Sequence, residues 1–461
     1  MAEVATQAPA PIGFETTGIE RVEENDRGHT QLWDTMWLWW SANSVVATVA
    51  VGLINVFFGL GFWGSLLVIV IANVIGVLPV AFLSTLGPKT GLAQMPLTRF
   101  SFGLQGARLP AIFNMIACVG WSAVNAIIGS SLLVTWSAGK IPLWAALIFL
   151  AIITTLVSVF GYFIVHRYER YAWIPMVILF GYVFVVAAPH FNIASLPAPA
   201  LLAPLALIGG ILTFGGAVLG YAIGWSSYAA DYTRRQPAST PASRVFWYAF
   251  LGVTIPCIVL ETLGVLLTTV AGGAALVGGL PGPVIANGLG TGAIASVVLL
   301  LLAFSTIANN VPNDYSFALS TQVVGLRVKR WILTIVGAVI YVIVAIYLSA
   351  KFEANLENFL LLIAYWLGAY STIVLIEHWL RKGQYAVQDY ETASKLPVGI
   401  AAVVSMVVGL AVAALGISQQ LFTGPLSKAL GGADIGFPLA IVASGILYFF
   451  LRKWELARYK R

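Results

Sequence analysis

The stretch that decides the fold is LLLLAFSTIANNVPNDYSFALS, residues 299–320. It starts as an apolar run of the kind that crosses a membrane as a helix. Within six residues it then carries three amides, a proline and a carboxylate: Asn309, Asn310, Pro312, Asn313 and Asp314. A polar group at membrane depth must face protein or a water-filled cavity, because hydrocarbon offers it no partner. The stretch therefore predicts a spanning helix with a ligand-facing polar side.

The composition places the whole chain in a membrane. Of its 461 residues, 59% are hydrophobic and 9% are charged, and the mean hydropathy is +0.91. Soluble domains carry about 25% charged residues. We therefore expect an all-α integral membrane protein. Twelve transmembrane helices are predicted near residues 34–59, 62–84, 109–136, 142–165, 171–189, 203–229, 244–271, 291–321, 331–350, 357–380, 396–417 and 434–451.

Lysine and arginine indicate the orientation of these spans, because cytoplasmic loops are enriched in both. With both termini placed in the cytoplasm, every Lys and Arg falls on the cytoplasmic side except Lys140, Lys351 and Lys428. We therefore predict a multi-pass protein of the cell membrane, in contact with membrane lipid. The net charge of +6 reflects this bias and requires no nucleic-acid partner.

Two spans are interrupted at corresponding places. The first contains WWSANSVVATVAVG and the sixth contains GGILTFGGAVLGYAIGWSSYAADYTRR. Polar or glycine-rich breaks at matching positions of two halves are typical of inverted-repeat transporters. We expect a five-plus-five inverted repeat with two additional C-terminal helices. The predicted parts are a mobile cytoplasmic tail (1–32), two five-helix repeats (33–190 and 203–380), helices eleven and twelve (396–451) and a C-terminal tail (452–461).

Span three offers one candidate pair for ligand recognition. Trp121 and Asn125 are four residues apart, so they share one helix face. An indole one turn from an amide could stack on a flat heteroaromatic ring and hydrogen-bond it. The alternative is a packing tryptophan beside an asparagine that bonds a neighbouring helix.

Spans six and one hold further candidates. Trp225 fits either a second pocket wall or an interfacial anchor, and Asp231 fits an ion pair with Arg234 or Arg235 at the cytoplasmic boundary. In span one, Ser41 and Asn43 could contact a ligand or satisfy backbone groups at the helix break.

The opening stretch is the richest in candidates. Asn309 and Asn313 share one face, and Asn310 and Asp314 share another. Pro312 leaves the Ala308 carbonyl without its helical partner. A freed carbonyl and inward-facing amides can contact a neutral polar solute. The alternative is a kinked helix whose amides lock neighbouring helices together.

Ionisable groups inside the spans are few. Glu261 in span seven is a functional candidate by default, either for proton coupling or as a hydrogen-bonded structural acid. An intramembrane metalloprotease needs two histidines in an H-E-x-x-H pattern, which this sequence lacks. Cys118 and Cys257 lie in apolar runs and are expected to be buried thiols. We expect a transporter, with no enzymatic activity, no bound metal and no cofactor.

Three motifs together resemble nucleobase:cation symporter family 1, in particular bacterial cytosine permeases and fungal purine–cytosine permeases. They are GWSAVN (residues 120–125), GWSSYAADYTRR (224–235) and ANNVPNDYSFALS (308–320). The resemblance spans nearly the whole chain. It implies the five-plus-five fold and import of a nucleobase, such as cytosine, adenine, guanine or hypoxanthine, together with a cation.

The resemblance also implies roles for single residues. Trp121 would stack on the base and Asn125 would hydrogen-bond it, while Asn313 would contact the base with support from Asn309. Trp225 would form the aromatic wall from span six, with Tyr221 or Ala222 as alternatives in register. Span-one contacts would fall on Ser41 or Asn43. Apart from the resemblance, we consider Asn309 and Glu261 as candidate cation-coupling residues, Glu261 because it is an ionisable group inside a span.

One departure from the family bears on the coupling cation. Sodium-coupled members similar to this chain have two adjacent Ser/Thr residues immediately before the asparagine that aligns with Asn309. Here those positions are Ile307 and Ala308, and Ser305 and Thr306 would lie about 200° round a regular helix. We therefore predict proton rather than sodium coupling. The alternatives are a permease for allantoin, a hydantoin or a vitamin-like pyrimidine, and a non-transporting receptor or intramembrane enzyme.

Overall fold

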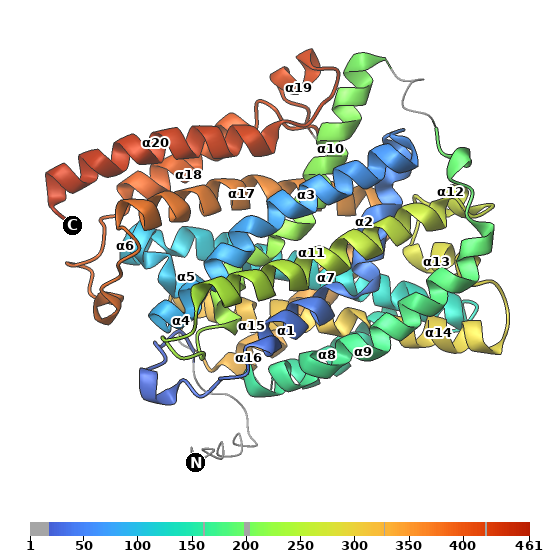
Figure 1. Cartoon of the computed structure of the whole chain (residues 1–461), viewed down its shortest axis with the longest axis horizontal. Coiled ribbons are helices and arrows are strands. Elements are labelled where there is room, and N and C mark those ends of the chain that lie inside the picture. Colours follow the sequence, from blue (N-terminus) through green and yellow to red (C-terminus); the bar gives the residue numbers. More distant parts are fainter. Residues whose placement is uncertain (1–17, 160–161, 198–202, 327, 420–421) are drawn as a thin grey trace.

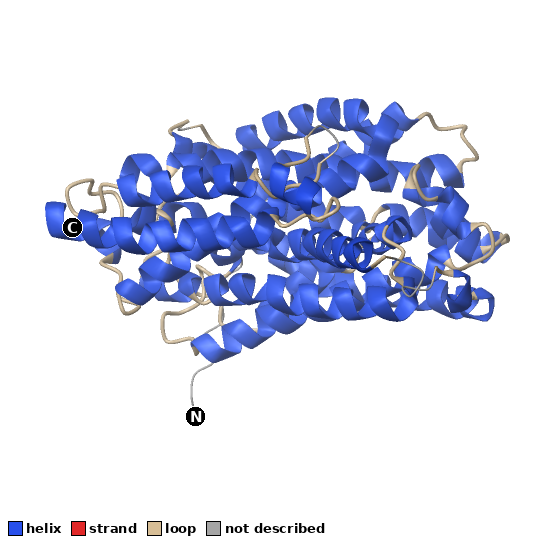
Figure 2. Cartoon of the chain, turned by 90° about the horizontal axis from the view of Figure 1, so that it is seen from above, coloured by secondary structure: helices blue, strands red, loops and turns tan. Residues whose placement is uncertain are grey.

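A computed structural model of the chain describes residues 18–461 except 160–161, 198–202, 327 and 420–421. Within these residues the regular elements are helices, apart from one isolated bridge between Ser418 and Thr423 (Figure 2). The long helices run side by side along the long axis of the molecule (Figure 1). The predicted fold class, an all-α membrane bundle, is confirmed.

The helices that fall on the predicted spans follow the expected order. In span order they are α1 (Trp33–Asn43) with α2 (Val46–Leu53) and η2 (Ile54–Phe57), α3 (Gly61–Ser84), α7 (Arg108–Trp136), α8 (Leu143–Ser158), α9 (Tyr162–Ala187), α10 (Pro204–Ile223) with η6 (Gly224–Tyr232), α11 (Ala242–Thr268), α14 (Ala293–Ala303) with α15 (Thr306–Val324), α16 (Arg330–Leu348), α17 (Phe352–Leu380), α18 (Ile400–Ala413) and α20 (Gly436–Tyr459).

Short helices connect these elements. They are η1 (Glu24–Asp26), α4 (Leu86–Thr90), α5 (Gln94–Leu97), α6 (Arg99–Gly106), η3 (Ala188–His190), η4 (Ile193–Ser195), α12 (Gly273–Leu276), α13 (Pro281–Leu289), η7 (Ser349–Lys351), η8 (Val387–Asp389) and α19 (Pro425–Ala429). The connection between spans two and three holds α4 to α6, and the connection between spans seven and eight holds α12 and α13.

The described residues contain eight helical stretches long and apolar enough to cross a membrane, and the bent pair α1–α2 makes a ninth. One of the eight, Arg330–Leu380, comprises both α16 and α17, while α8 and α18 are shorter apolar helices. Each of the twelve expected spans therefore falls on an apolar helix or a broken helix. The number of crossings stays a prediction.

Some expected boundaries were wrong. Span four was placed at 142–165, but α8 ends at Ser158 and α9 already begins at Tyr162. The C-terminal tail was placed at 452–461, but α20 continues to Tyr459. Arg452 explains this extension, because its buried guanidinium pairs with Glu377 on α17 at 2.9 Å and so fixes another turn of α20 against the bundle.

The breaks in spans one and six are confirmed. The axis bends by 53° between α1 and the helix that follows it, and Val45 at the joint is extended, with φ −138° and ψ 161°. In span six, α10 gives way to the 3₁₀ segment η6, where Tyr228 has non-helical angles of φ −143° and ψ 20°. Two interrupted helices thus begin the two predicted repeats.

The eighth span is also interrupted, although the sequence predicts breaks only in spans one and six. The break lies at Phe304–Ser305, between α14 and α15, whereas α15 runs without interruption through Pro312. Proline is tolerated inside spanning helices where neighbouring helices take up the freed backbone groups. The hydroxyl of Tyr232 contacts this helix, donating to the carbonyl of Pro312 at 2.9 Å, whereas the group that the proline frees is the carbonyl of Ala308.

Packing between helices follows the symmetry of an inverted repeat. Span three packs on span nine (α7 on α16), and span eight packs on span four (α15 on α8). Likewise α2 packs on α11 as α10 packs on α3, and α1 packs on α9 as α10 packs on α17. Each pair is the counterpart of the other when spans one to five are exchanged with six to ten. Helices α18 and α20 pack on α17, outside the two repeats.

The N-terminal segment was expected to be a mobile tail, but its described part, from Gly18 onward, is docked on the bundle. Val22 N–H donates to the carbonyl of Gly91 at 2.9 Å, and the Arg27 guanidinium donates to the carbonyl of Pro88 at 2.6 Å. Arg27 is buried there. Arg27 thus bonds a carbonyl of α4, and the N-terminal segment lies against this helix.

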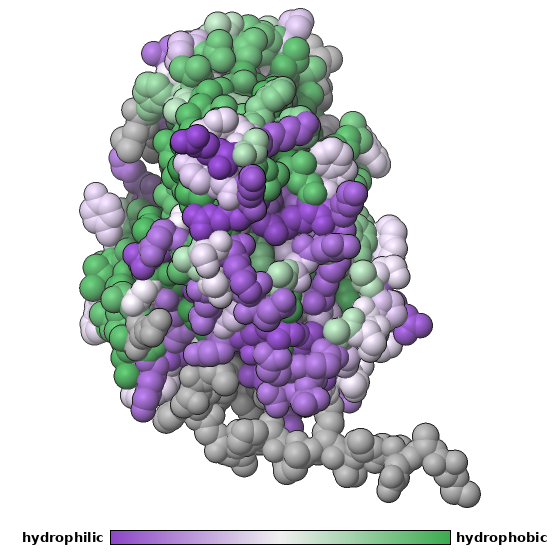
Figure 3. All heavy atoms as spheres, turned by 90° about the vertical axis from the view of Figure 1, so that its left-hand side faces the viewer, coloured by the Kyte–Doolittle hydropathy of each residue, from purple (hydrophilic) through white to green (hydrophobic). Residues whose placement is uncertain are grey.

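Figure 3 looks onto the end of the bundle where the C-terminus lies, and hydrophilic residues cover much of that face. This is the predicted cytoplasmic end, which we call the basic end because Lys89, Arg99, Arg108, Arg234 and Arg381 lie there. The sides of the bundle carry exposed apolar residues such as Ile178, Val185 and Ile343, as expected of a surface in contact with lipid.

Candidate functional site

The candidate site is a small buried cavity between the broken sixth span and helices α7 and α15. Its volume is about 10 Å³, and it is lined by Trp121, Tyr221, Gly224, Trp225, Tyr228 and Asn309. Three of the residues predicted for substrate binding are therefore in its wall. The volume is no more than about the 10–15 Å³ that a single water molecule needs, so a heterocyclic ligand requires these side chains to move apart.

Aromatic rings form most of the wall. Trp121 meets Tyr221 edge-on at 5.4 Å between ring centres, and Trp225 meets Tyr228 edge-on at 5.5 Å. Trp121 lies over Gly224, where an added Cβ would sit 3.2 Å from the indole ring. A side chain at this position would contact Trp121 tightly, so the indole would have to shift by a few tenths of an ångström. The wall can stack on a flat ring once it opens.

The register of the span-six aromatic, which the sequence left open, is set by the start of η6. Trp225 and Tyr221 both line the cavity, whereas Ala222 does not. At Gly224 the α-helix α10 gives way to the 3₁₀ segment η6, and Tyr221 on α10 and Trp225 and Tyr228 on η6 all line the cavity.

Amides join the cavity wall into one network. Asn125 Nδ2 donates to Asn309 Oδ1 at 2.7 Å, and Asn309 Nδ2 donates to the Ala42 carbonyl at 2.6 Å. Tyr221 links the network to span one, since its hydroxyl lies 2.7 Å from Thr48 Oγ1. Within the described part of the chain, Asn125 Oδ1 is buried and has no partner. It is therefore an available hydrogen-bond acceptor.

Asn313 lies one turn beyond Asn309 on the same face of α15, as the spacing predicts. Its Oδ1 accepts a hydrogen bond from the Tyr228 hydroxyl at 2.7 Å, and its Nδ2 donates to the Asn309 carbonyl at 3.0 Å. Asn313 does not line the cavity itself but is hydrogen-bonded to Tyr228, which does.

The span-one candidates behave differently from each other. Asn43 Oδ1 accepts the indole N–H of Trp225 at 3.0 Å, so Asn43 supports a cavity residue. The Ser41 hydroxyl donates to the backbone carbonyl of Glu169 at 2.6 Å and does not line the cavity. In this arrangement Ser41 satisfies a backbone group near the helix break, which is the alternative role considered from the sequence.

Glu261 lies apart from the cavity, on α11. Its Oε2 accepts a hydrogen bond from Asn73 on α3 at 2.5 Å, and its other oxygen has no partner among the described residues. The backbone at Glu261 touches α2 so closely that a Cβ at Gly52 would lie 1.9 Å from the Glu261 carbonyl. Glu261 therefore borders the outer part of the broken first span.

The two aspartates join separate helices. Asp314, whose role the sequence left undecided, accepts hydrogen bonds from Ser158 on α8 at 2.9 Å and from Ser122 on α7 at 3.4 Å. Asp231 accepts from Gln94 N–H at 2.7 Å and from the Ser316 hydroxyl at 2.5 Å. Both carboxylates are buried within the protein.

Ser305 occupies an unexpected position. Its Oγ accepts a hydrogen bond from the N–H of Val46, the first residue of α2, at 3.2 Å. The interruption at Phe304–Ser305 precedes this stretch, and Ser305 itself has helical angles of φ −58° and ψ −34°, so its helical-wheel offset from Ile307 is kept. Ile307 and Ala308 are buried apolar residues, as expected.

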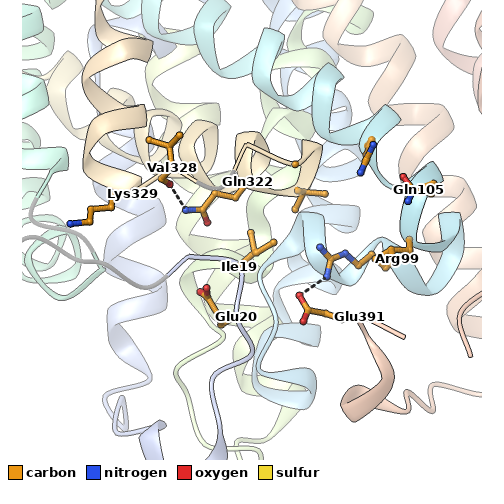
Figure 4. A pocket seen from close by; sticks show the side chains of 12 residues that line it. Ile19, Glu20, Arg99, Gln105, Gln322, Val328, Lys329 and Glu391 are labelled. Atoms are coloured by element: carbon orange, nitrogen blue, oxygen red, sulfur yellow. Dashed lines mark hydrogen bonds and ion pairs between the residues drawn. The ribbon is translucent and has the colours of Figure 1, made fainter. Parts of the chain in front are cut away.

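A larger cavity of about 580 Å³ opens at the basic end (Figure 4). Its labelled lining includes Arg99, which pairs with Glu391 at 3.4 Å, and Gln322, which donates to the Val328 carbonyl at 3.0 Å. Its lining residues are charged, polar or aliphatic, with no aromatic ring among them. This lining does not suit a flat neutral ring.

Two further observations limit the chemistry. Among the described residues, no three His, Cys, Asp or Glu side chains converge on a possible metal position. Cys118 and Cys257 are both buried free thiols, as predicted. The site's means of recognition are thus aromatic faces and hydrogen bonds.

The chain matches a known protein family along most of its length. Residues 21–439 match a protein family described as "Permease for cytosine/purines, uracil, thiamine, allantoin". The chain is 36% identical to the purine-cytosine permease fcyB of Emericella nidulans, over 98% of this chain and 91% of the relative. It is 33% identical to the purine-cytosine permease FCY2 of Saccharomyces cerevisiae, over 98% of this chain and 88% of the relative.

A solved structure has the same fold. MHP1, a nucleobase-cation-symport-1 family transporter in a closed conformation with bromovinylhydantoin bound, superposes with a TM-score of 0.71. The likeness covers 97% of this chain and 96% of that one at 16% sequence identity.

Proposed function

The chain belongs to the family of permeases for cytosine, purines, uracil, thiamine and allantoin, and from this premise we propose that it imports a nucleobase by cation symport across the cell membrane, with both termini in the cytoplasm. Cytosine and purines such as adenine, guanine and hypoxanthine are the proposed substrates. The purine-cytosine permeases that cover nearly the whole chain support this choice.

The observation that carries the proposal is the cavity at the break of span six. Trp121 and Trp225 offer aromatic faces for stacking on a flat ring, and Asn125 and Asn309 offer amides at its edge. Base–aromatic stacking contributes roughly 1–3 kcal/mol per base. The amides then select among bases, because a base that leaves a buried amide unpaired binds more weakly.

Uptake of radiolabelled cytosine and adenine in cells expressing the protein tests the proposal. We expect saturable uptake that an excess of the unlabelled base abolishes, and a panel of unlabelled competitors then ranks the substrates. Uptake equal to that of cells without the protein, for every nucleobase tested, would contradict it. Allantoin and a hydantoin belong in the panel because the family description names allantoin and the solved structure holds a hydantoin. Pyridoxine belongs in it because a vitamin B6 transporter that is 27% identical is also a relative.

We propose a proton as the coupling ion. Ile307 and Ala308 offer no side-chain oxygen, and the Ser305 hydroxyl accepts a hydrogen bond from Val46 N–H. Glu261 is the proposed proton-carrying residue, since it is buried with a single amide partner and borders the broken first span. Replacing sodium with choline at fixed pH should leave uptake unchanged. Strict sodium dependence would overturn proton coupling and make Ser305 the first residue to test as a ligand.

A further inference from the structure

Tyr228 was not among the residues predicted to bind substrate, yet it lines the cavity and bonds Asn313, which does not line it. It is buried at the kink of η6 and its ring lines the cavity beside Trp225. Its hydroxyl donates to Asn313 Oδ1 at 2.7 Å. The contact joins the broken sixth span to α15 of the eighth span, and both spans belong to the second predicted repeat.

This hydrogen bond engages the amide oxygen of Asn313, the residue that the family resemblance assigns to the base. Both polar groups of Asn313 are engaged within the protein, Oδ1 by Tyr228 and Nδ2 by the Asn309 carbonyl. The cavity of about 10 Å³ has no room for a ring beside the tyrosine. An amide oxygen can accept two hydrogen bonds, but Tyr228 lines the cavity and Asn313 does not, so a ligand N–H that comes from the cavity meets Asn313 Oδ1 on the side that the Tyr228 hydroxyl occupies.

The displaced hydroxyl then needs a new partner, because a buried O–H without one is costly. The ligand itself can supply this partner if it carries an acceptor next to the N–H group that bonds Asn313. Nucleobases have such an edge: the exocyclic amine of cytosine or adenine lies beside an unprotonated ring nitrogen. A ring with the donor but without the neighbouring acceptor would leave the hydroxyl unpaired.

On the basis of the proposed function, we propose that Tyr228 is a specificity-determining residue. Its hydroxyl occupies Asn313 until a heterocycle with adjacent donor and acceptor replaces it, donating to Asn313 and accepting from Tyr228. The site thereby selects the donor–acceptor edge of a base and rejects flat rings that lack the acceptor.

Two sets of ligands, one of two compounds and one of three, test the inference. One pair is cytosine and its analogue with C–H in place of the ring nitrogen beside the amine. The other set is adenine and its two deaza analogues, in which the ring nitrogen on either side of the amine is C–H. Binding is measured by competition against a labelled base on purified protein. For the wild type we expect at least one analogue to bind roughly 2- to 10-fold more weakly than its parent, the size of one hydrogen bond.

The variant Tyr228→Phe keeps the ring and removes the hydroxyl. We expect it to bind parent and analogue with affinities that agree within about twofold, because the discriminating hydroxyl is gone. Tyr370→Phe is the matched control, since Tyr370 is equally buried but bonds Gln94 outside the cavity. This control should keep the wild-type ratio.

The outcomes separate the inference from the proposed function. If wild-type protein binds no nucleobase, the proposed function fails. If it binds the parent bases but every analogue equally well, or if Tyr228→Phe retains the full discrimination, the role of Tyr228 is overturned while nucleobase transport stands. If Tyr228→Phe does not fold, the wild-type comparison still tests the role of Tyr228, because equal binding of every analogue and its parent base overturns it.

Discussion

The indole N–H of Trp225 donates to Oδ1 of Asn43 at 3.0 Å, and this bond joins the broken sixth span to the broken first span. Trp225 also meets Trp39 of α1 edge-on at 5.2 Å. The two interrupted helices therefore meet at a cavity residue, and a change in the cavity wall can reach both repeats.

The first prediction concerns this bond. Trp225→Phe keeps an aromatic wall but loses the N–H, so we expect a loss of about 0.5–1.5 kcal/mol in folding stability with nucleobase binding retained. Asn43→Ala should cost about 1–3 kcal/mol, because it leaves a buried indole N–H unpaired. Thermal unfolding of the purified protein ranks the two. The opposite order, with Trp225→Phe the more damaging, would show that the ring rather than the bond matters.

The second prediction tests stacking by Trp121. Removing this ring in Trp121→Ala should weaken nucleobase binding roughly 5- to 150-fold, since base–aromatic stacking is worth about 1–3 kcal/mol. Trp121→Phe should retain part of the affinity. The control is Trp63→Ala on α3, whose ring is 70% exposed on the outside of the bundle. Normal transport by Trp121→Ala would remove Trp121 from the site.

The third prediction concerns the docked N-terminal segment. Gly91 has φ +71°, and an added Cβ would lie 2.2 Å from the Arg27 guanidinium and 2.4 Å from the Val22 carbonyl. We expect Gly91→Ala to release the segment, so that limited proteolysis cuts it near residue 22 faster than in the wild type.

Gly139→Ala is the control for the third prediction. Gly139 also has a positive φ, +80°, but an added Cβ there meets nothing within 4 Å. This variant should show only the backbone strain of about 1–2 kcal/mol and leave cleavage of the N-terminal segment unchanged. Equal protection of the segment in both variants would contradict the steric argument.

Much of this arrangement could be predicted from the sequence. Hydropathy located the spans, and the shared polar breaks indicated the inverted repeat. The four-residue spacing placed Asn309 and Asn313 on one face of α15 correctly. These features depend on local chemistry, namely on which side chains hydrocarbon accepts and on the period of a helix.

The features that sequence missed depend on contacts between distant segments. The break before α15 lies at Phe304–Ser305, where the Ser305 hydroxyl accepts a hydrogen bond from Val46 N–H of span one. The partner of Tyr228, 85 positions away, has no local signal, although the three-residue spacing from Trp225 placed both on one side of η6. Docking of the N-terminal segment depends likewise on carbonyls of α4.

The last prediction tests Glu261 as the proton-carrying residue. If a proton moves inward with the base, lowering the external pH should raise wild-type uptake, because the inward proton gradient becomes steeper. Glu261→Gln keeps the hydrogen-bonding shape but cannot gain or lose a proton. We expect it to bind the base and to exchange labelled for unlabelled base, while accumulation against a gradient and its pH dependence disappear.

Glu353→Gln is the matched control for this experiment. Glu353 is also buried, at the start of α17, and its carboxylate oxygens have no partner among the described residues, but it does not border the broken first span. The control should accumulate base with the wild-type pH dependence. Pairing uptake with counterflow in liposomes separates coupling from binding, since counterflow needs no proton gradient. If Glu261→Gln still accumulates base, or if Glu353→Gln loses accumulation instead, the coupling carboxylate is not Glu261.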